Sequence, residues 1–256
     1  MLGGQKILAV VPARSGSKGL PDKNMRTLHG VSLIGWAGEV LKWLPDVDAK
    51  VISTDSPRYA EEGSRYGLEA PFLRSAELSG DLAGAIETMQ HAVEECEGYY
   101  GHRFDIALIV QPTSPFRTSD DIVRTARCLI DSNADSAVTV SRLDAKSHPW
   151  NILRINQGRL LYAHEEGPRV QSRQAFKGEY YWKNGLCYAV SRSSLMEHSR
   201  IFSENTLPVI IDRPVANIDV EMDLEWARFL IDRFYTGSDE GTPIPQEWPI
   251  SQEQPG

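Results

Sequence analysis

The stretch ILAVVPARSGSKGLPDKN, residues 7–24, decides the fold. Its first five residues are apolar and rich in β-branched side chains, and a proline and a glycine loop follow them, as is typical of a buried parallel strand. Glycines let successive backbone N–H groups turn towards an anion, and cations add full charge. The composition predicts a polyphosphate cradle, with a mobile, basic surface loop as the alternative. The loop carries Gly16 and Gly19 together with Arg14, Lys18 and Lys23.

Apolar runs and helical patterns alternate along residues 1–141. This alternation predicts an α/β fold with a doubly wound, mostly parallel sheet and helices on both faces. Ligands bind such sheets at the carboxyl ends of the strands, so the loops PARSGSKG, STDS and QPTSPFR should meet at one rim. The predicted strands are 7–11, 49–55, 68–73, 104–116 and 134–141, and the predicted helices are 32–44, 57–67, 82–96 and 119–132, the last with Ser119 as its N-cap.

The pattern changes after residue 141. Residues 151–163 predict a hairpin with its turn at 156–158, and 164–184 is a polar, aromatic stretch. The α/β rhythm returns at 185 and ends with a helix over 220–235. We therefore expect a core of 1–141 and 185–236, with 142–184 as an inserted subdomain or dimer arm. A flexible tail, rich in Pro, Glu, Gln and Ser, should follow over 237–256.

The composition excludes several classes of function. A net charge of −8 over 256 residues argues against a nucleic-acid-binding surface. The three cysteines form no disulfide or zinc pattern, which favours a reducing cytoplasm. No run approaches the roughly 18 apolar residues of a membrane span. The loop matches neither GxxxxGK[ST] nor GxGxxG, so kinase-like and dinucleotide-binding sites are disfavoured.

The loop VPARSGSKGLPDKN resembles the signature loop of the CMP-sialic acid synthetase (N-acylneuraminate cytidylyltransferase) family. Five further segments resemble motifs of this family, in the same order. They are STDS at 53–56, RSAELSGD at 74–81, QPTSPFR at 111–117, KNGLCY at 183–188 and NIDVEMDL at 217–224. The resemblance implies a Rossmann-like nucleotidyltransferase fold with a small β-containing arm, over 142–184, that serves dimerisation and completes the sugar site. It also implies a Mg²⁺-dependent homodimer that joins CTP to a nine-carbon 2-keto sugar acid, releasing pyrophosphate.

The resemblance also assigns site residues. It places Arg14, Lys23 and Asp219 in catalysis and implies that Gln111, Arg173 and Tyr188 face the sugar acid. Arg169 is the alternative to Arg173, and Tyr188 is alternatively an ordinary core residue. Arg117 either contacts the ligand or pairs with an acid such as Asp120. The nucleotide ligands implied are Arg14, Ser15, Gly16, Ser17, Lys18, Asn24, Arg74 and Asp81.

Asp219 is the predicted Mg²⁺ ligand, and capping the last helix is its alternative role. Many relatives have a D-x-D pair here, whereas this chain has Asn217, an amide that can bind the ion or its water without adding charge. Asn151 stands where sialic acid enzymes often have a lysine, which suggests different sugar substituents. Two alternatives remain open: a sugar-1-phosphate nucleotidyltransferase, and a non-catalytic nucleotide-binding homologue.

Overall fold

The protein was analysed as a computed structural model that describes residues 2–80, 83–169, 178–235 and 245–250. The chain divides into two compact units. The first comprises 1–139, 184–209 and 214–256, and the second comprises 140–183 and 210–213. The second unit overlaps the arm expected at 142–184.

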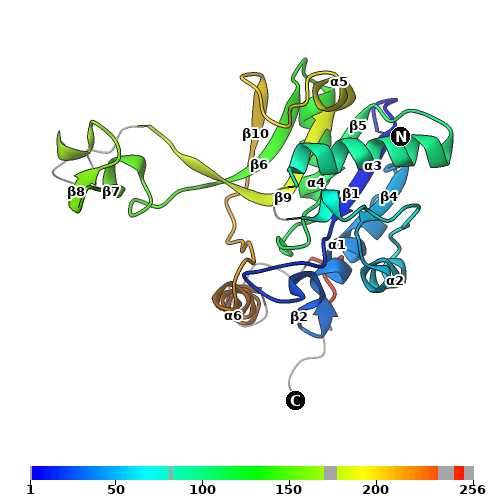
Figure 1. Cartoon of the computed structure of the whole chain (residues 1–256), viewed down its shortest axis with the longest axis horizontal. Helices are drawn as coiled ribbons and strands as arrows, with labels where there is room; N and C mark the ends of the chain where they lie inside the picture. The colour runs from blue at the N-terminus through cyan, green and yellow to red at the C-terminus, as the bar shows by residue number, and fades with distance from the viewer. Residues whose placement is uncertain (1, 81–82, 170–177, 236–244, 251–256) are drawn as a thin grey trace. The chain divides into compact units, whose positions relative to one another are not determined.

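A six-stranded sheet in the order β10-β6-β9-β5-β1-β4 forms the framework (Figure 1). Both β4 and β5 pair with β1 in parallel, and β9 runs antiparallel to β5. The prediction of a mostly parallel sheet is therefore confirmed. Side chains of β1 are almost completely buried, as a strand covered on both faces requires. The strands are β1 Ile7–Pro12, β4 Ala49–Ser53, β5 Ile106–Ile109, β6 Ser136–Arg142, β9 Tyr181–Ser191 and β10 Thr206–Ile210.

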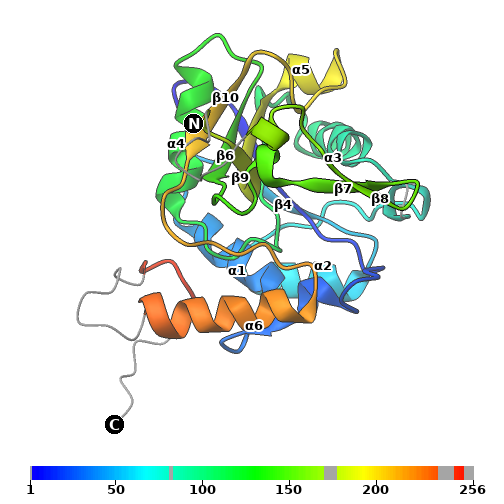
Figure 2. The same cartoon turned by 90° about the vertical axis from the view of Figure 1, so that its left-hand side faces the viewer.

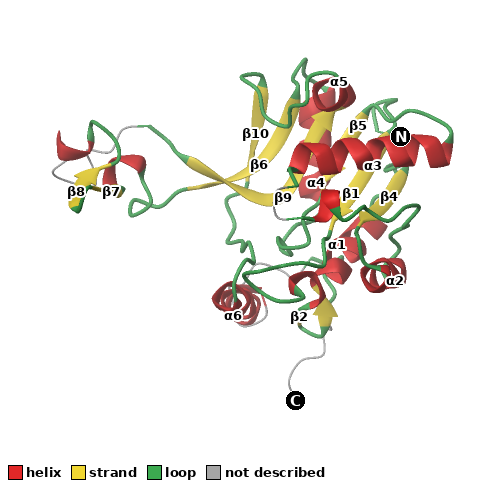
Figure 3. Ribbon diagram, in the orientation of Figure 1, coloured by secondary structure: helices red, strands yellow, loops and turns green. Residues whose placement is uncertain are grey.

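Helices cover both faces of the sheet in the first unit. The connections β1–α1–β4 and β4–α3–β5 move in opposite directions along the sheet, and right-handed crossovers then put α1 and α3 on opposite faces. Figure 3 shows α3 crossing in front of the strands. The doubly wound arrangement is thus confirmed. The helices are α1 Leu33–Lys42, α2 Pro57–Arg65, α3 Ala85–Tyr100, α4 Ser119–Ile130, α5 Arg192–Met196 and α6 Glu221–Leu230.

The C-terminal helix α6 continues as a π-helical turn over Ile231–Tyr235 and lies beside β2 (Figure 2). The small hairpin of β2 (Thr27–Leu28) and β3 (Val31–Ser32) connects the glycine loop to α1. A short 3₁₀ turn, η1 (Lys23–Met25), precedes β2. These pieces bring the end of the glycine loop close to the start of α6.

The second unit contains a hairpin of β7 (Leu153–Asn156) and β8 (Arg159–Tyr162), as predicted. Gln157 and Gly158 both have positive φ, the signature of a tight I′ turn. Every residue of the two strands is exposed. The role of this unit as a dimerisation arm stays a prediction.

Two local predictions are wrong. Residues 68–73 do not form a strand: only Glu69 pairs with β4, through an isolated bridge to Val51, and Pro71 removes a backbone donor shortly afterwards. The N-cap of α4 is Thr118 instead of Ser119. Thr118 and Asp121 exchange the reciprocal hydrogen bonds of a capping box.

The expected flexible tail is also wrong for residues 245–250. Trp248 is 3% exposed and lies edge-on to Trp36 and Tyr235, with ring centroids 5.6 and 4.7 Å away. Its indole Nε1 donates a hydrogen bond to the carbonyl of Arg117 at 2.7 Å. The aromatic cluster therefore holds this segment against the core.

Candidate active site

A cavity of about 710 Å³ opens in the first unit at the carboxyl ends of β1 and β5. The glycine loop lines one part of it, the QPT segment after β5 another, and the segment before α6 a third. Of the three loops predicted to meet at one rim, those after β1 and β5 both line the cavity, whereas no residue of STDS at 53–56 is among its described lining residues. Nine of the predicted site residues line the cavity: Arg14, Ser17, Lys18, Lys23, Asn24, Arg74, Gln111, Asn217 and Asp219.

The glycine loop is fixed from both sides by side chains. The backbone N–H and the hydroxyl of Ser15 both donate to the carboxylate of Asp55, at 2.9 and 2.6 Å. The amide of Asn24 donates to the carbonyl of Arg14 at 3.1 Å, and Asn24 is buried. Ser15 and Gly16 are not among the residues lining the cavity in the described part of the chain. Their binding of a nucleotide stays a prediction.

Lys23 and Asp219 both line the cavity and form an ion pair with each other. The Lys23 Nζ lies 2.7 Å from Asp219 Oδ1, and the carboxylate side chain is 68% exposed. Gly19 makes this approach possible, because a Cβ there would lie only 2.9 Å from the carbonyl oxygen of Asp219. A predicted phosphate ligand and a predicted metal ligand are therefore paired with each other.

Asp223 caps α6, so the expectation that Asp219 could do so is wrong. The Asp223 carboxylate accepts hydrogen bonds from the N–H groups of Asp219 and Val220, at 2.8 and 3.0 Å. This leaves the Asp219 carboxylate for Lys23 and the cavity. Nearby, Asn217 Oδ1 is buried without a hydrogen-bond partner among the described residues.

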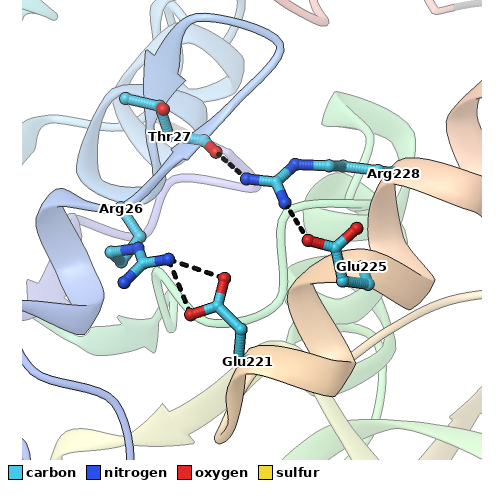
Figure 4. Close-up of polar contacts among 5 residues, drawn as sticks. All are labelled: Arg26, Thr27, Glu221, Glu225 and Arg228. Carbon is cyan, nitrogen blue, oxygen red and sulfur yellow. Dashed lines mark hydrogen bonds and ion pairs between the residues drawn. The ribbon is translucent and has the colours of Figure 1, made fainter.

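Arg26 and Glu221 join the start of α6 to the chain that follows Lys23 (Figure 4). Arg26 Nη2 lies 2.6 Å from both carboxylate oxygens of Glu221. Arg228 bonds Glu225 on its own helix and reaches the carbonyl of Thr27 at 3.5 Å. Sequence reasoning missed these contacts because 195 residues separate Arg26 from Glu221 and no local pattern marks the pair.

Arg74 is buried at the cavity wall. Its side chain is 7% exposed, and Nε and Nη2 have no hydrogen-bond partner in the described structure. Burial lowers the pKa of Arg74, the neighbouring Asp55 acts against this change, and Arg14 adds to it. For Asp55, burial alone would raise the pKa, but the hydrogen bonds from Ser15 and the charge of Arg74 lower it overall. Arg14, Arg74 and Asp55 therefore form one electrostatic group.

Arg117 supports the cavity from behind instead of facing it. It is fully buried, and its guanidinium donates to the carbonyl of Leu186 at 2.8 Å and to that of Gln111. Burial lowers the pKa of Arg117 to about 10. The expected pairing with Asp120 is wrong, because Arg117 bonds backbone carbonyls while Asp120 lies 3.9 Å from Arg124.

The remaining predicted sugar ligands have different positions. Gln111 lines the cavity, and its Oε1 lies so close to Gly185 that a Cβ there would be 2.5 Å away. Tyr188 is buried against Phe202 and does not line the cavity in the described structure. Arg169 pairs with Glu166 in the second unit at 2.6 Å. Asp81 and Arg173 lie outside the described residues.

The described residues lack two further features. No group of three or more His, Cys, Asp or Glu side chains is arranged to hold a metal ion. No helix in the same part of the chain is both long and apolar enough to span a bilayer.

A mostly parallel sheet with a cationic glycine loop facing an acidic loop defines an α/β nucleotidyltransferase. Residues 8–157 match the family model described as cytidylyltransferase, and the chain belongs to that family.

Two relatives and one solved structure show the range of this similarity. The chain is 32% identical to a CMP-N,N'-diacetyllegionaminic acid synthase of Legionella pneumophila over 87% of this chain and 94% of that protein. It is 28% identical to an N-acylneuraminate cytidylyltransferase of Escherichia coli over 87% of this chain and 51% of that protein. The structure of a CMP:2-keto-3-deoxy-manno-octonic acid synthetase complexed with CTP superposes with a TM-score of 0.64, at 19% identity, covering 89% of this chain and 99% of that one.

Proposed function

We propose that the protein is a cytidylyltransferase that activates a nine-carbon 2-keto sugar acid of the sialic acid type with CTP, giving a CMP-sugar and pyrophosphate. The family assignment and the names of the two relatives support this substrate class. The observation that carries the proposal is that the cations of the glycine loop and the Asp219 carboxylate line the same cavity.

The chemistry needs positioning and charge more than covalent participation. The anomeric hydroxyl of the sugar acid attacks the α-phosphorus of CTP, and the bond to the β-phosphate oxygen breaks. Charge grows on the departing pyrophosphate, and fixed cations aimed at that charge lower the barrier. Arg14, Lys18 and Lys23 line the cavity and are suited to this role. Gln111 lines the same cavity and is suited to hold the sugar acid.

The donor set fits a magnesium ion. Mg²⁺ takes oxygen ligands, usually one or two carboxylates together with water and substrate phosphates. Asp219 supplies an exposed carboxylate, and the buried Asn217 Oδ1 has no hydrogen-bond partner in the described structure. We propose that these two residues hold the ion, which neutralises triphosphate charge when bound. Lys23 has three ammonium N–H donors and Asp219 has two carboxylate oxygens, so their 2.7 Å contact does not prevent the lysine from binding phosphate while the carboxylate holds the ion.

Turnover with a panel of sugar acids tests this function. The protein is incubated with CTP, Mg²⁺ and N-acetylneuraminic, legionaminic or pseudaminic acid, and pyrophosphate is measured. Release with at least one acid is expected, and an EDTA-treated sample should be inactive. No release across the panel, combined with turnover of a sugar 1-phosphate, would identify the alternative enzyme class.

Asn217→Asp separates an enzyme from a non-catalytic homologue. If the native chain binds CTP without product and the variant makes CMP-sugar, the native protein is the binding module. Size measurement in solution tests the proposed homodimer, and localisation of a tagged chain tests the proposed cytoplasmic site. The homodimer rests on the family resemblance, and the cytoplasmic location rests on the cysteine pattern.

A further inference from the structure

Asp55 lies beside the glycine loop without lining the cavity. It follows β4 by two residues, and its two carboxylate oxygens take both donors of Ser15. The O–H to carboxylate distance of 2.6 Å is typical of a charge-assisted hydrogen bond. Both hydrogen-bond donors of Ser15 therefore bond Asp55, and this contact anchors the glycine loop.

This anchor acts at the point where the loop leaves the sheet. The N–H of Ala13 still bonds the carbonyl of Ser53 at 2.9 Å, so the pairing of β1 with β4 extends to that residue. Asp55 then holds the N–H of Ser15, while Asn24 holds the carbonyl of Arg14. The peptide group that joins Arg14 to Ser15 is thus hydrogen-bonded at both its carbonyl and its N–H, directly beside a side chain that lines the cavity.

The same carboxylate provides countercharge for a buried cation. Arg74 is 7% exposed, and two of its guanidinium nitrogens have no hydrogen-bond partner in the described structure. The backbone N–H of Arg74 donates to the carbonyl of Thr54, the residue directly before Asp55. Burying a charge without an opposite charge nearby is costly, so Asp55 favours the charged form of Arg74.

We propose that Asp55 is a positioning residue for the nucleotide site: through Ser15 it sets the backbone of the glycine loop so that Arg14 faces the triphosphate, and it balances the charge of Arg74. This inference rests on the proposed function, because it assumes that the cavity binds CTP. Asp55 itself touches neither substrate nor metal in this scheme.

The chain offers a matched control at the other end of the same two strands. Asp48, directly before β4, accepts a hydrogen bond from the N–H of Ile7 at 2.8 Å. Asp48→Asn and Asp55→Asn each replace a charged carboxylate that accepts from a backbone N–H by a neutral amide with one acceptor oxygen, one far along the strands from the cavity and one beside it.

The experiment compares these two variants with Ser15→Ala in the full-length protein. We expect Asp55→Asn to raise the KM for CTP about tenfold with a smaller change in kcat, and to weaken CTP binding in calorimetry similarly. Ser15→Ala should have a smaller effect of the same kind, and the double variant should be no worse than Asp55→Asn. Asp48→Asn should leave the KM unchanged. An unchanged KM in Asp55→Asn overturns the proposal, and so does an equal rise in both aspartate variants.

Hydrogen exchange gives a readout that needs no substrate. The Ser15 amide should exchange at least tenfold faster in Asp55→Asn than in Asp48→Asn, and equal rates overturn the anchor. If the unaltered protein binds no CTP and turns over no sugar acid, the proposed function fails, while exchange still decides whether Asp55 holds the loop.

Discussion

Gly16 and Gly19 differ in the space around them, although both belong to the same loop. A Cβ at Gly19 would lie 2.9 Å from the backbone carbonyl of Asp219, which cannot rotate away, whereas a Cβ at Gly16 would meet nothing within 4 Å. Gly19→Ala should therefore push the loop away from Asp219 and reduce kcat/KM about tenfold, equivalent to about 1.4 kcal/mol. Gly16→Ala is the matched control and should stay close to the unaltered protein. Equal losses in steady-state assays of both variants would contradict this explanation.

Individual residues could be predicted from the sequence where a motif is local. The cations of the glycine loop and Gln111 were assigned in this way, and the structure places them around one cavity. The anchor between Ser15 and Asp55 could not be predicted, because its strength comes from the folded contact of two segments 40 residues apart. The role of Arg117 could not be predicted either, because it bonds backbone carbonyls, which every residue type has.

The attachment of α6 is a property of elements, because it sets the position of Asp219 at the start of that helix. Arg26 and Glu221 are partly exposed, so their ion pair should contribute less than about 1 kcal/mol to stability. Arg26→Ala is nevertheless expected to lower kcat several-fold, since the segment carrying Asp219 loses a support, while Tm changes by no more than about 2 °C. Activity and thermal unfolding are measured on the same preparation.

The control for this prediction is Arg65→Ala, which removes the pairs of Arg65 with the exposed Glu61 and the buried Glu62, within α2 and away from the cavity. It should leave kcat unchanged even if the loss of a partner for Glu62 lowers Tm. The exchange variant Arg26→Glu with Glu221→Arg should recover part of the activity lost in Arg26→Ala. Loss of activity in Arg65→Ala to the same degree, or no loss in Arg26→Ala, would show that the pair does not position the helix.

Helices and strands with a clear pattern of apolar residues could be predicted from the sequence, whereas features defined by tertiary contacts could not. The hairpin of β7 and β8 and the strands around the glycine loop follow their sequence patterns. The segment 68–73 has the apolar character of a strand, but only Glu69 finds a partner in the sheet. The N-cap of α4 lies one residue before the predicted Ser119, because Thr118 forms reciprocal hydrogen bonds with Asp121. The preference for Ser at N-caps does not predict such a pair.

At the scale of the whole molecule, the described residues that line the cavity all belong to the first compact unit. The nucleotide part of the candidate site is therefore built by one unit of the chain. Of the sugar ligands expected in the inserted segment, Arg173 lies outside the described residues, and completion of the site by a second subunit stays a proposal. The sequence predicted the core through its ordered motifs. It did not predict that residues 245–250 belong to it.

The segment 245–250 extends the core through a single large side chain. Trp248 packs among Trp36, Phe116 and Tyr235, and its indole bonds the carbonyl of Arg117. Trp248→Ala should therefore lower the free energy of unfolding by about 3 kcal/mol, a typical cost of truncating a buried aromatic residue.

Trp248 bonds the carbonyl of Arg117, and the Arg117 guanidinium bonds the carbonyl of Gln111 at the cavity. Trp248→Ala should therefore displace Gln111 and lower kcat/KM at temperatures where the variant is still folded. The matched control is Trp226→Ala, because that tryptophan is 49% exposed on α6 and its removal should cost much less stability. Urea denaturation compares the two variants, since the midpoint shift at a constant m-value measures the change in stability. If Trp226→Ala were as destabilising as Trp248→Ala, or if neither shifted the midpoint, the C-terminal segment would not be part of the core.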